Sequence, residues 1–133
     1  MHHEVPVKVT AYVDEGIAHL VEALNLFPGL CTIDSCQGHG EEGLAHVFFD
    51  YRGSVRDLFE VTLSLSAVVL KRLADKGHGE CGWEVSWDAD NPPSGHVSLD
   101  PAAVDDAATA LTEYARLVGD GSDRGSTCTP LRN

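Results

Sequence analysis

Residues 30–51 of the chain read LCTIDSCQGHGEEGLAHVFFDY. Residues 30–34 and 45–51 are rich in β-branched, aromatic and other apolar side chains, which favour strands. The segment between them contains three glycines and ends each run abruptly, as turns do. The stretch therefore predicts two antiparallel strands joined by a glycine-rich turn, and the rest of the fold is built around this hairpin.

The segment before the hairpin predicts a strand followed by a helix. Residues 8–13 alternate in a strand-like way, and Asp14 is a good N-cap for a helix after this strand. Residues 17–24 place apolar side chains three and four positions apart, which is the spacing of an amphipathic helix. Phe27-Pro28-Gly29 is a helix stop signal, so this helix ends before residue 30.

The segment after the hairpin predicts a long second helix. Ser54 followed by Asp57 has the spacing of a capping box, and glycines at 77–79 stop the helix. One apolar stripe runs along it and is expected to face the core. The stripe comprises Val55, Leu58, Phe59, Thr62, Leu65, Ser66, Val69 and Leu73.

A second hairpin and a third helix come next. Residues 83–87 alternate as a strand, residues 90–95 form a turn, and residues 96–99 return as the partner strand. Asp100 caps a helix that has Pro101 at its first position and Gly119 beyond its end. The side chains expected to face the core are Trp83, Val85 and Trp87 in the strand and Val104, Ala107, Ala108, Leu111, Tyr114, Ala115 and Val118 in the helix.

These elements predict an α+β fold with a mostly antiparallel sheet. Two hairpins and an N-terminal strand pack with three helices, and the order helix-strand-strand occurs twice. A weak internal similarity accompanies this order, because residues 46–50 and 96–100 both begin His-Val and end in Asp before a helix. We expect residues 1–119 to form one domain and residues 120–133, which are rich in Gly, Ser, Thr and Asp, to form a flexible tail.

Composition limits the partners of the chain. Its 9 Lys and Arg residues against 21 Asp and Glu give a formal net charge of -12, so binding to a nucleic-acid backbone is not expected. An acidic surface instead suits a basic protein partner or an inhibitor that mimics nucleic acid. No apolar run has the length of a membrane span, and four cysteines without a C-x-x-C pair predict a cytoplasmic protein.

The glycine-rich turn concentrates the residues suited to chemistry. Cys36 could act as a nucleophile that His39 or His46 activates, with Asp34 orienting the imidazole. Cys36 and His39 could equally be two ligands of a zinc ion. The other zinc ligands would then come from Cys31, His46, His78 or Cys81.

A ligand pocket is the third interpretation of the same turn. Its glycine amides and polar side chains can donate and accept hydrogen bonds, and Trp83 or Trp87 would supply an aromatic wall. In this interpretation Cys36 lines the site and His39 or His46 acts as a general base. The residues assigned to binding the ligand are Asp34, Ser35, Gln37 and Gly38.

A family resemblance bears on the pocket interpretation. A helix, an Asn25-x-x-Pro28 link and a strand that ends in Ser35-Cys36-Gln37-Gly38 make residues 13–50 similar to the tRNA wybutosine-synthesis methyltransferase family. The resemblance implies an α/β domain that binds S-adenosylmethionine and methylates a modified guanosine in tRNA. The positions that match the family's turn are Ser35, Cys36 and Gly38.

The chain differs from that family at position 39, which is His instead of the typical Arg, and it lacks the later His- and Arg-rich strand motif. We therefore expect a small-ligand-binding domain on a methyltransferase-like scaffold, with S-adenosylmethionine or a nucleoside as ligand. Methyl transfer by this domain stays open. An acidic interaction protein and a zinc-binding domain are the alternatives.

Overall fold

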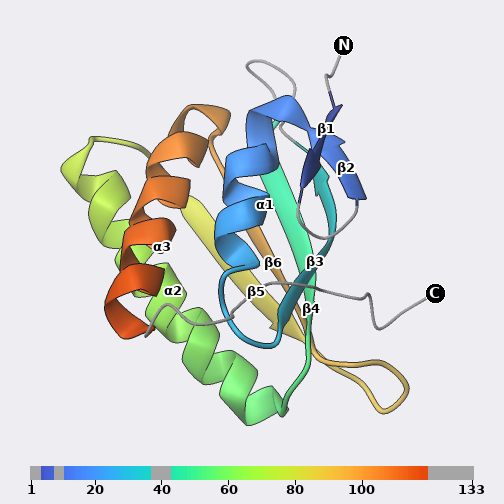
Figure 1. The fold of residues 1–133 in the computed structure, drawn as a ribbon. Helices are drawn as coiled ribbons and strands as arrows, with labels where there is room; N and C mark the ends of the chain where they lie inside the picture. Colours follow the sequence, from blue (N-terminus) through green and yellow to red (C-terminus); the bar gives the residue numbers. More distant parts are fainter. Residues whose placement is uncertain (1–3, 8–10, 37–42, 120–133) are drawn as a thin grey trace.

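The computed structural model describes residues 4–7, 11–36 and 43–119. Within these residues the main sheet contains four strands in the order β3-β4-β6-β5, and every neighbouring pair is antiparallel. The strands are β3 (Leu30–Cys36), β4 (Ala45–Tyr51), β5 (Cys81–Ser86) and β6 (Ser94–Leu99). The two predicted hairpins, β3–β4 and β5–β6, are confirmed, and they meet at the centre of the sheet through β4 and β6 (Figure 1).

The three helices of the described ranges lie on one face of this sheet (Figure 1). They are α1 (Ala18–Leu24), α2 (Val55–Asp75) and α3 (Val104–Val118), and the short 3-10 turns η1 (Glu15–Ile17) and η2 (Pro101–Ala103) precede α1 and α3. The expected α+β class is confirmed, and so is the order helix-strand-strand repeated. The expected tail, residues 120–133, lies outside the described residues.

The N-terminal segment differs from the expected single strand over residues 8–13, of which 8–10 lie outside the described residues. Strands β1 (Glu4–Val7) and β2 (Ala11–Asp14) pair with each other as a separate two-stranded sheet. The first helix also begins later than an N-cap at Asp14 would place it. Its N-cap residue is Ile17, which makes no side-chain capping bond, because the 3-10 turn η1 comes first.

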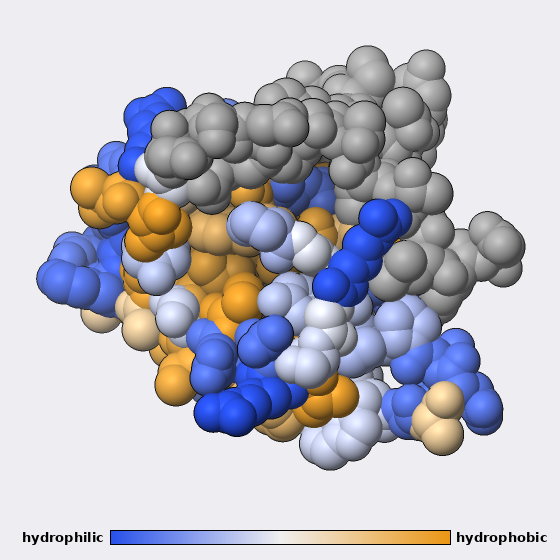
Figure 2. All heavy atoms as spheres, turned by 60° about the horizontal axis from the view of Figure 1, so that its bottom comes forward, coloured by the Kyte–Doolittle hydropathy of each residue, from blue (hydrophilic) through white to orange (hydrophobic). Residues whose placement is uncertain are grey.

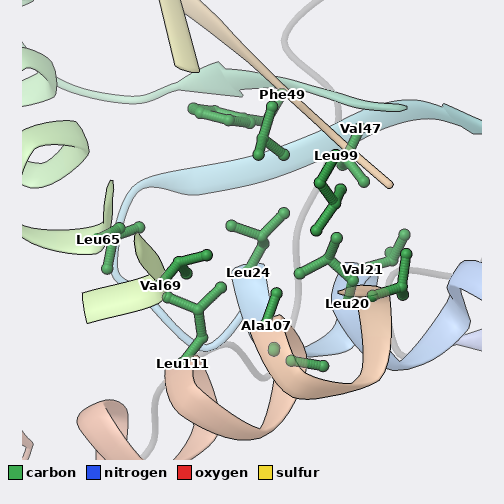
Figure 3. Packing of buried hydrophobic residues seen from close by; sticks show 14 of the residues in the cluster. Leu20, Val21, Leu24, Val47, Phe49, Leu65, Val69, Leu99, Ala107 and Leu111 are labelled. Atoms are coloured by element: carbon green, nitrogen blue, oxygen red, sulfur yellow. The ribbon is translucent and has the colours of Figure 1, made fainter. Parts of the chain in front are cut away.

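The core lies between the sheet and the helices. Alternate side chains of the central strands, Val47 and Phe49 on β4 and Val97 and Leu99 on β6, are buried toward the helices. Figure 3 shows Val47, Phe49 and Leu99 facing apolar side chains that come from all three helices. Those labelled on the helices are Leu20, Val21, Leu24, Leu65, Val69, Ala107 and Leu111.

Asn25 links α1 to β3 through buried hydrogen bonds. Its Nδ2 donates to the carbonyl oxygen of Val21 (3.0 Å) and to Oγ1 of Thr32 (2.8 Å), and its Oδ1 accepts from the backbone N–H of Thr32 (3.1 Å). The ladder between β3 and β4 shifts register between Thr32 and Asp34. The side chain of Asn25 thus satisfies polar groups at the irregular part of the strand, as buried polar groups require.

The predicted start of α2 is confirmed, whereas the 3-10 turn η2 precedes α3, so Asp100 caps η2 and the N-cap residue of α3 is Ala103. Oγ of Ser54 accepts from the backbone N–H of Asp57 (3.0 Å), and Oδ1 of Asp100 accepts from that of Ala102 (3.0 Å). Three core assignments are wrong. Phe59 is 47% exposed, Trp87 is 57% exposed, and Val118, the last residue of α3, is 56% exposed. Phe59 follows the buried Leu58 by one residue, a rotation of about 100° around the helix, and Trp87 lies one residue beyond the end of β5.

Candidate functional site

The face of the sheet opposite the helices carries the candidate site. Because successive side chains of a strand alternate in direction, His46 and Phe48 on β4 and His96 on β6 point away from the buried side chains between them. None of the described helices lies on this face (Figure 1). Phe48 stays 41% exposed there, at the centre of the sheet.

The ring of Phe48 stacks on that of His96, and the ring of His46 lies edge to edge with that of His96 in a nearly parallel plane; we call these three side chains the aromatic platform. The ring centroids of Phe48 and His96 are 4.2 Å apart with planes at 13°, and those of His46 and His96 are 4.9 Å apart with planes at 9°. Phe48 and His96 are also direct cross-strand partners in the ladder. The platform is therefore a flat surface of parallel rings with one large apolar ring still exposed.

A hydrogen bond joins the two histidines of the platform. Nδ1 of His46 lies 2.7 Å from Nε2 of His96. One of these two atoms must carry a hydrogen and the other a lone pair, so both rings cannot be fully protonated while the bond exists. The pair therefore keeps at least one imidazole in its neutral form.

Carboxylates flank the platform on both outer strands. Glu84 on β5 and Asp34 on β3 are the cross-strand partners of His96 and Phe48, so all four side chains belong to one row across the sheet. Oε1 of Glu84 lies 3.6 Å from Nδ1 of His96. Oδ1 of Asp34 accepts from the backbone N–H of Ser35 (2.9 Å). The site thus combines an aromatic centre with a negative charge on each side.

The structure brings two of the three predicted catalytic residues together. Cys36 is the cross-strand partner of His46, and its thiol is not part of a disulfide. His39, Gln37 and Gly38 lie outside the described residues. Of the predicted ligand-binding residues, Asp34 is exposed and Ser35 half-buried. Asp34 belongs to β3 as expected, and Ser35 also belongs to β3 and not to the turn in which it was expected.

The cysteine and histidine residues proposed to complete a zinc site are dispersed. Cys31 is buried and disulfide-bonded, which removes it as a thiolate ligand. Nε2 of His78 lies 2.7 Å from Oδ2 of Asp106 at the start of α3. In the part of the chain that the structure describes, no three His, Cys, Asp or Glu residues are grouped to hold a metal ion. The disulfide is also more typical of oxidising compartments than of the expected cytoplasm.

Cys81 is on the opposite side of the sheet from the platform. It alternates with the exposed Gly82 and packs against the core beside Trp83 and Val85. Burial raises the pKa of its thiol to about 11, against a smaller lowering effect of the Trp83 side chain. Cys81 is therefore a protonated, unreactive thiol at neutral pH.

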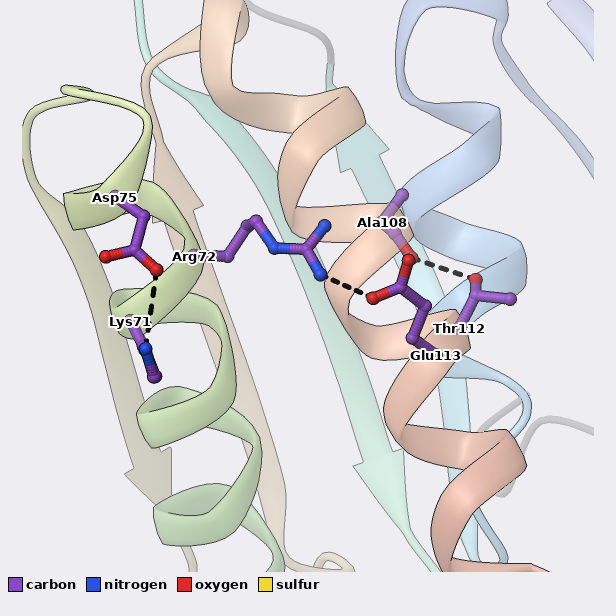
Figure 4. A network of polar contacts seen from close by, with 6 residues as sticks. All are labelled: Lys71, Arg72, Asp75, Ala108, Thr112 and Glu113. Atoms are coloured by element: carbon purple, nitrogen blue, oxygen red, sulfur yellow. Dashed lines mark hydrogen bonds and ion pairs between the residues drawn. The ribbon is translucent and has the colours of Figure 1, made fainter.

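Two hollows lined by described residues lie on the helical side, away from the platform. One, of about 310 Å³, lies between α2 and α3 and contains the ion pair of Arg72 with Glu113 and the pair of Lys71 with Asp75 (Figure 4). The other, of about 250 Å³, is lined mainly by apolar residues. Figure 2 shows apolar side chains gathered around a depression on this end of the molecule. Neither hollow includes a predicted site residue among its described lining.

The sequence interpretation missed Phe48, His96 and Glu84 as site residues. It assigned the aromatic wall to Trp83 or Trp87, but Trp83 packs against the core and Trp87 contacts Phe59 of α2. The available signal was the alternation in residues 45–51, which places His46 and Phe48 on one face and Val47 and Phe49 on the other. An exposed phenylalanine between two histidines, one of them on another strand, follows only from the pairing of β4 with β6.

Comparison of the chain with protein-family models, with curated proteins and with solved structures gave no significant match. Among the described residues, no helix combines the length and the apolar character needed to cross a bilayer.

Proposed function

We propose that the aromatic platform binds a small planar ligand of the nucleoside type, and that S-adenosylmethionine is the first candidate. The observation that carries this proposal is the stacked arrangement of Phe48 on His96, with the Phe48 ring exposed on the face of the sheet that the described helices do not cover. An exposed aromatic ring held by its neighbours is a suitable base-stacking surface, and such stacking contributes about 1–3 kcal/mol per base.

The carboxylates of Asp34 and Glu84 support the same ligand class. They flank the platform at the two outer strands and can accept hydrogen bonds from amino and hydroxyl groups of a nucleoside. S-Adenosylmethionine also carries a sulfonium and an ammonium group, whose positive charges suit an acidic site on a chain of formal net charge -12. The resemblance of residues 13–50 to a methyltransferase family is consistent with this ligand.

His46 is the residue best placed to act as a base if a methyl group is transferred. The carboxylate of Glu84, 3.6 Å away, favours a proton on Nδ1 of His96. Nε2 of His96 then accepts a hydrogen from Nδ1 of His46, which leaves Nε2 of His46 with its lone pair. In this scheme bound S-adenosylmethionine supplies the electrophilic methyl group, and Nε2 of His46 takes the proton that the methylated substrate loses.

Calorimetric titration with adenosine and S-adenosylmethionine tests the proposal. We expect saturable binding that Phe48→Ala weakens tenfold or more, because that substitution removes the stacking surface. Phe59→Ala is the matched control, since Phe59 is exposed to a similar extent (47%) but lies on α2. Absence of saturable heat with both ligands, or an equal effect of the two substitutions, contradicts the proposal.

A further inference from the structure

Cys31 is one half of a disulfide bond, and the sequence leaves one cysteine as its partner. Among the described residues Cys36 and Cys81 are free thiols, whereas Cys31 is disulfide-bonded. The chain contains four cysteines, and the fourth is Cys128. Within a single chain the partner left for Cys31 is therefore Cys128, which belongs to the C-terminal segment, residues 120–133.

Cys31 points to the side of the sheet that carries the aromatic platform. On β4, Phe49 and Tyr51 are buried toward the helices, so Asp50 between them points to the opposite side. Asp50 is the cross-strand partner of Cys31, and cross-strand partners lie on the same face of a sheet. The disulfide bond of Cys31 is thus formed on the platform face, which is the face of the sheet opposite the helices.

This end of the platform face is buried although no described helix covers it (Figure 1). Cys31 is 1% exposed and Asp50 is 0% exposed. Phe48, a far larger side chain two residues from Asp50 on the same face, is 41% exposed. The cross-strand neighbours of Asp50 are Cys31 and Ser94, which are too small to enclose a carboxylate. Another part of the chain is needed to cover this end of the face.

The C-terminal segment has the charge that a cover for Asp50 requires. A buried carboxylate is stable only beside a positive charge or hydrogen-bond donors. The chain has 9 Lys and Arg residues, and the C-terminal segment contains two of them, Arg124 and Arg132. The segment can therefore bring positive charge as well as Cys128 to the region of Asp50.

The C-terminal segment is also long enough to reach Cys31. Helix α3 ends at Val118, which lines the same hollow as Phe27. Phe27 precedes Cys31 by four residues, a span of at most about 14 Å. The chain from Gly119 to Cys128 reaches about 30 Å when it is extended. Since β3 is an edge strand of the four-stranded sheet, this length suffices to pass around its edge to the platform face.

We propose that the C-terminal segment forms a strap that passes the edge of β3, covers Asp50 and is fastened by a disulfide bond between Cys31 and Cys128. Asp50 and Phe48 lie two residues apart on the same face of β4, so the strap borders the aromatic platform. The redox state of the two cysteines then decides whether this end of the platform face is covered. The strap requires no ligand on the platform.

Fastening the strap is a two-electron oxidation. The two S–H bonds of Cys31 and Cys128 break, one S–S bond forms, and two protons and two electrons pass to a small disulfide such as glutathione disulfide, which becomes two thiols. A dithiol such as dithiothreitol returns the two protons and two electrons and releases the strap. Cys36 and Cys81 take no part in either direction.

Thiol labelling followed by peptide mass spectrometry tests the disulfide bond. The full chain is oxidised with glutathione disulfide, unfolded in urea without a reductant and treated with N-ethylmaleimide. We expect the label on Cys36 and Cys81, and a linked pair of peptides that contain Cys31 and Cys128. A label on Cys128, or a bond from Cys31 to any other cysteine, including one of a second copy, overturns the proposal.

Alkylation of the folded variant Cys128→Ser tests whether the segment covers the platform face. Without its partner Cys31 is a thiol, and we expect iodoacetamide to modify it at least tenfold faster than Cys81, which is buried on the helical side of the same molecule. Slow modification of Cys81 also shows that the variant is folded. Cys36→Ser is the matched control, because it keeps the bond and should leave Cys31 unmodified. A Cys31 in Cys128→Ser that reacts as slowly as Cys81 overturns the strap.

Discussion

At the scale of single residues, Asn25 shows how one side chain can fix the relation of two elements. It is 5% exposed and is hydrogen-bonded to both the last turn of α1 and the irregular part of β3. The same residue is part of the Asn-x-x-Pro link that resembles the methyltransferase family. Its hydrogen bonds provide a structural reason for an asparagine at this position.

We predict that Asn25→Leu lowers the free energy of unfolding by about 2–4 kcal/mol, because it leaves the buried N–H and hydroxyl of Thr32 without this partner. Urea denaturation measures the change. Asn91→Ala serves as the control, since the hydrogen bonds of Asn91 to Asp88 lie in an exposed turn. A loss for Asn25→Leu no larger than that for Asn91→Ala would contradict the structural role.

At the scale of elements, β5 shows the consequence of covering only one face of a strand. Cys81, Trp83 and Val85 pack toward the helices, whereas Gly82, Glu84 and Ser86 are exposed. The protonation of Cys81 reports on this arrangement, because burial raises its pKa from 9.0 to about 11.

We predict that alkylation of Cys81 in the folded protein accelerates up to about pH 11, whereas in urea its rate levels off near the ordinary thiol pKa of 9.0. Peptide mass spectrometry after timed exposure to iodoacetamide measures both rates. The same shift destabilises the fold as pH rises through this interval, because the unfolded chain loses the thiol proton first. Identical profiles in the two states would show that Cys81 is not buried.

The sequence predicts a helix or strand correctly where the spacing of its apolar residues depends only on residues close together in the chain. Each strand and helix buries one face, and this produces a regular spacing of apolar residues. Examples are the alternation in residues 45–51 and the helical spacing of Leu58, Leu65 and Leu73, so the strands and helices could be located. Phe59 and Trp87 were misplaced because each lies at the boundary of such a face. The platform could not be predicted, since the contact of His46 with His96 depends on the register of β4 with β6, and no local pattern encodes that register.

At the scale of the whole molecule, the formal net charge of -12 produces repulsion between like charges in both the folded and the unfolded chain. Repulsion between like charges is stronger in the compact state than in the expanded unfolded state. The exposed ion pair of Arg56 with Glu60 offsets little of this repulsion, because a surface ion pair contributes only about 0–1 kcal/mol to the free energy of unfolding.

We predict that the midpoint of thermal unfolding rises between low and physiological ionic strength, as the screening length falls from about 30 Å at 0.01 M to about 8 Å at 0.15 M. Differential scanning calorimetry in sodium chloride and in choline chloride measures it, and screening requires the same rise in both salts. A midpoint that falls with salt would mean that attractive ion pairs outweigh the repulsion.

The pairing of β4 with β6 also has a consequence for how the chain folds. Each hairpin joins strands that are close in sequence, but the central ladder brings together residues as distant as His46 and His96, which are 50 positions apart. Closing such a loop costs entropy before any contact compensates for it, so distant strand pairs form slowly. The two halves of the sheet can form early as separate hairpins, and the histidine pair is completed only when they join.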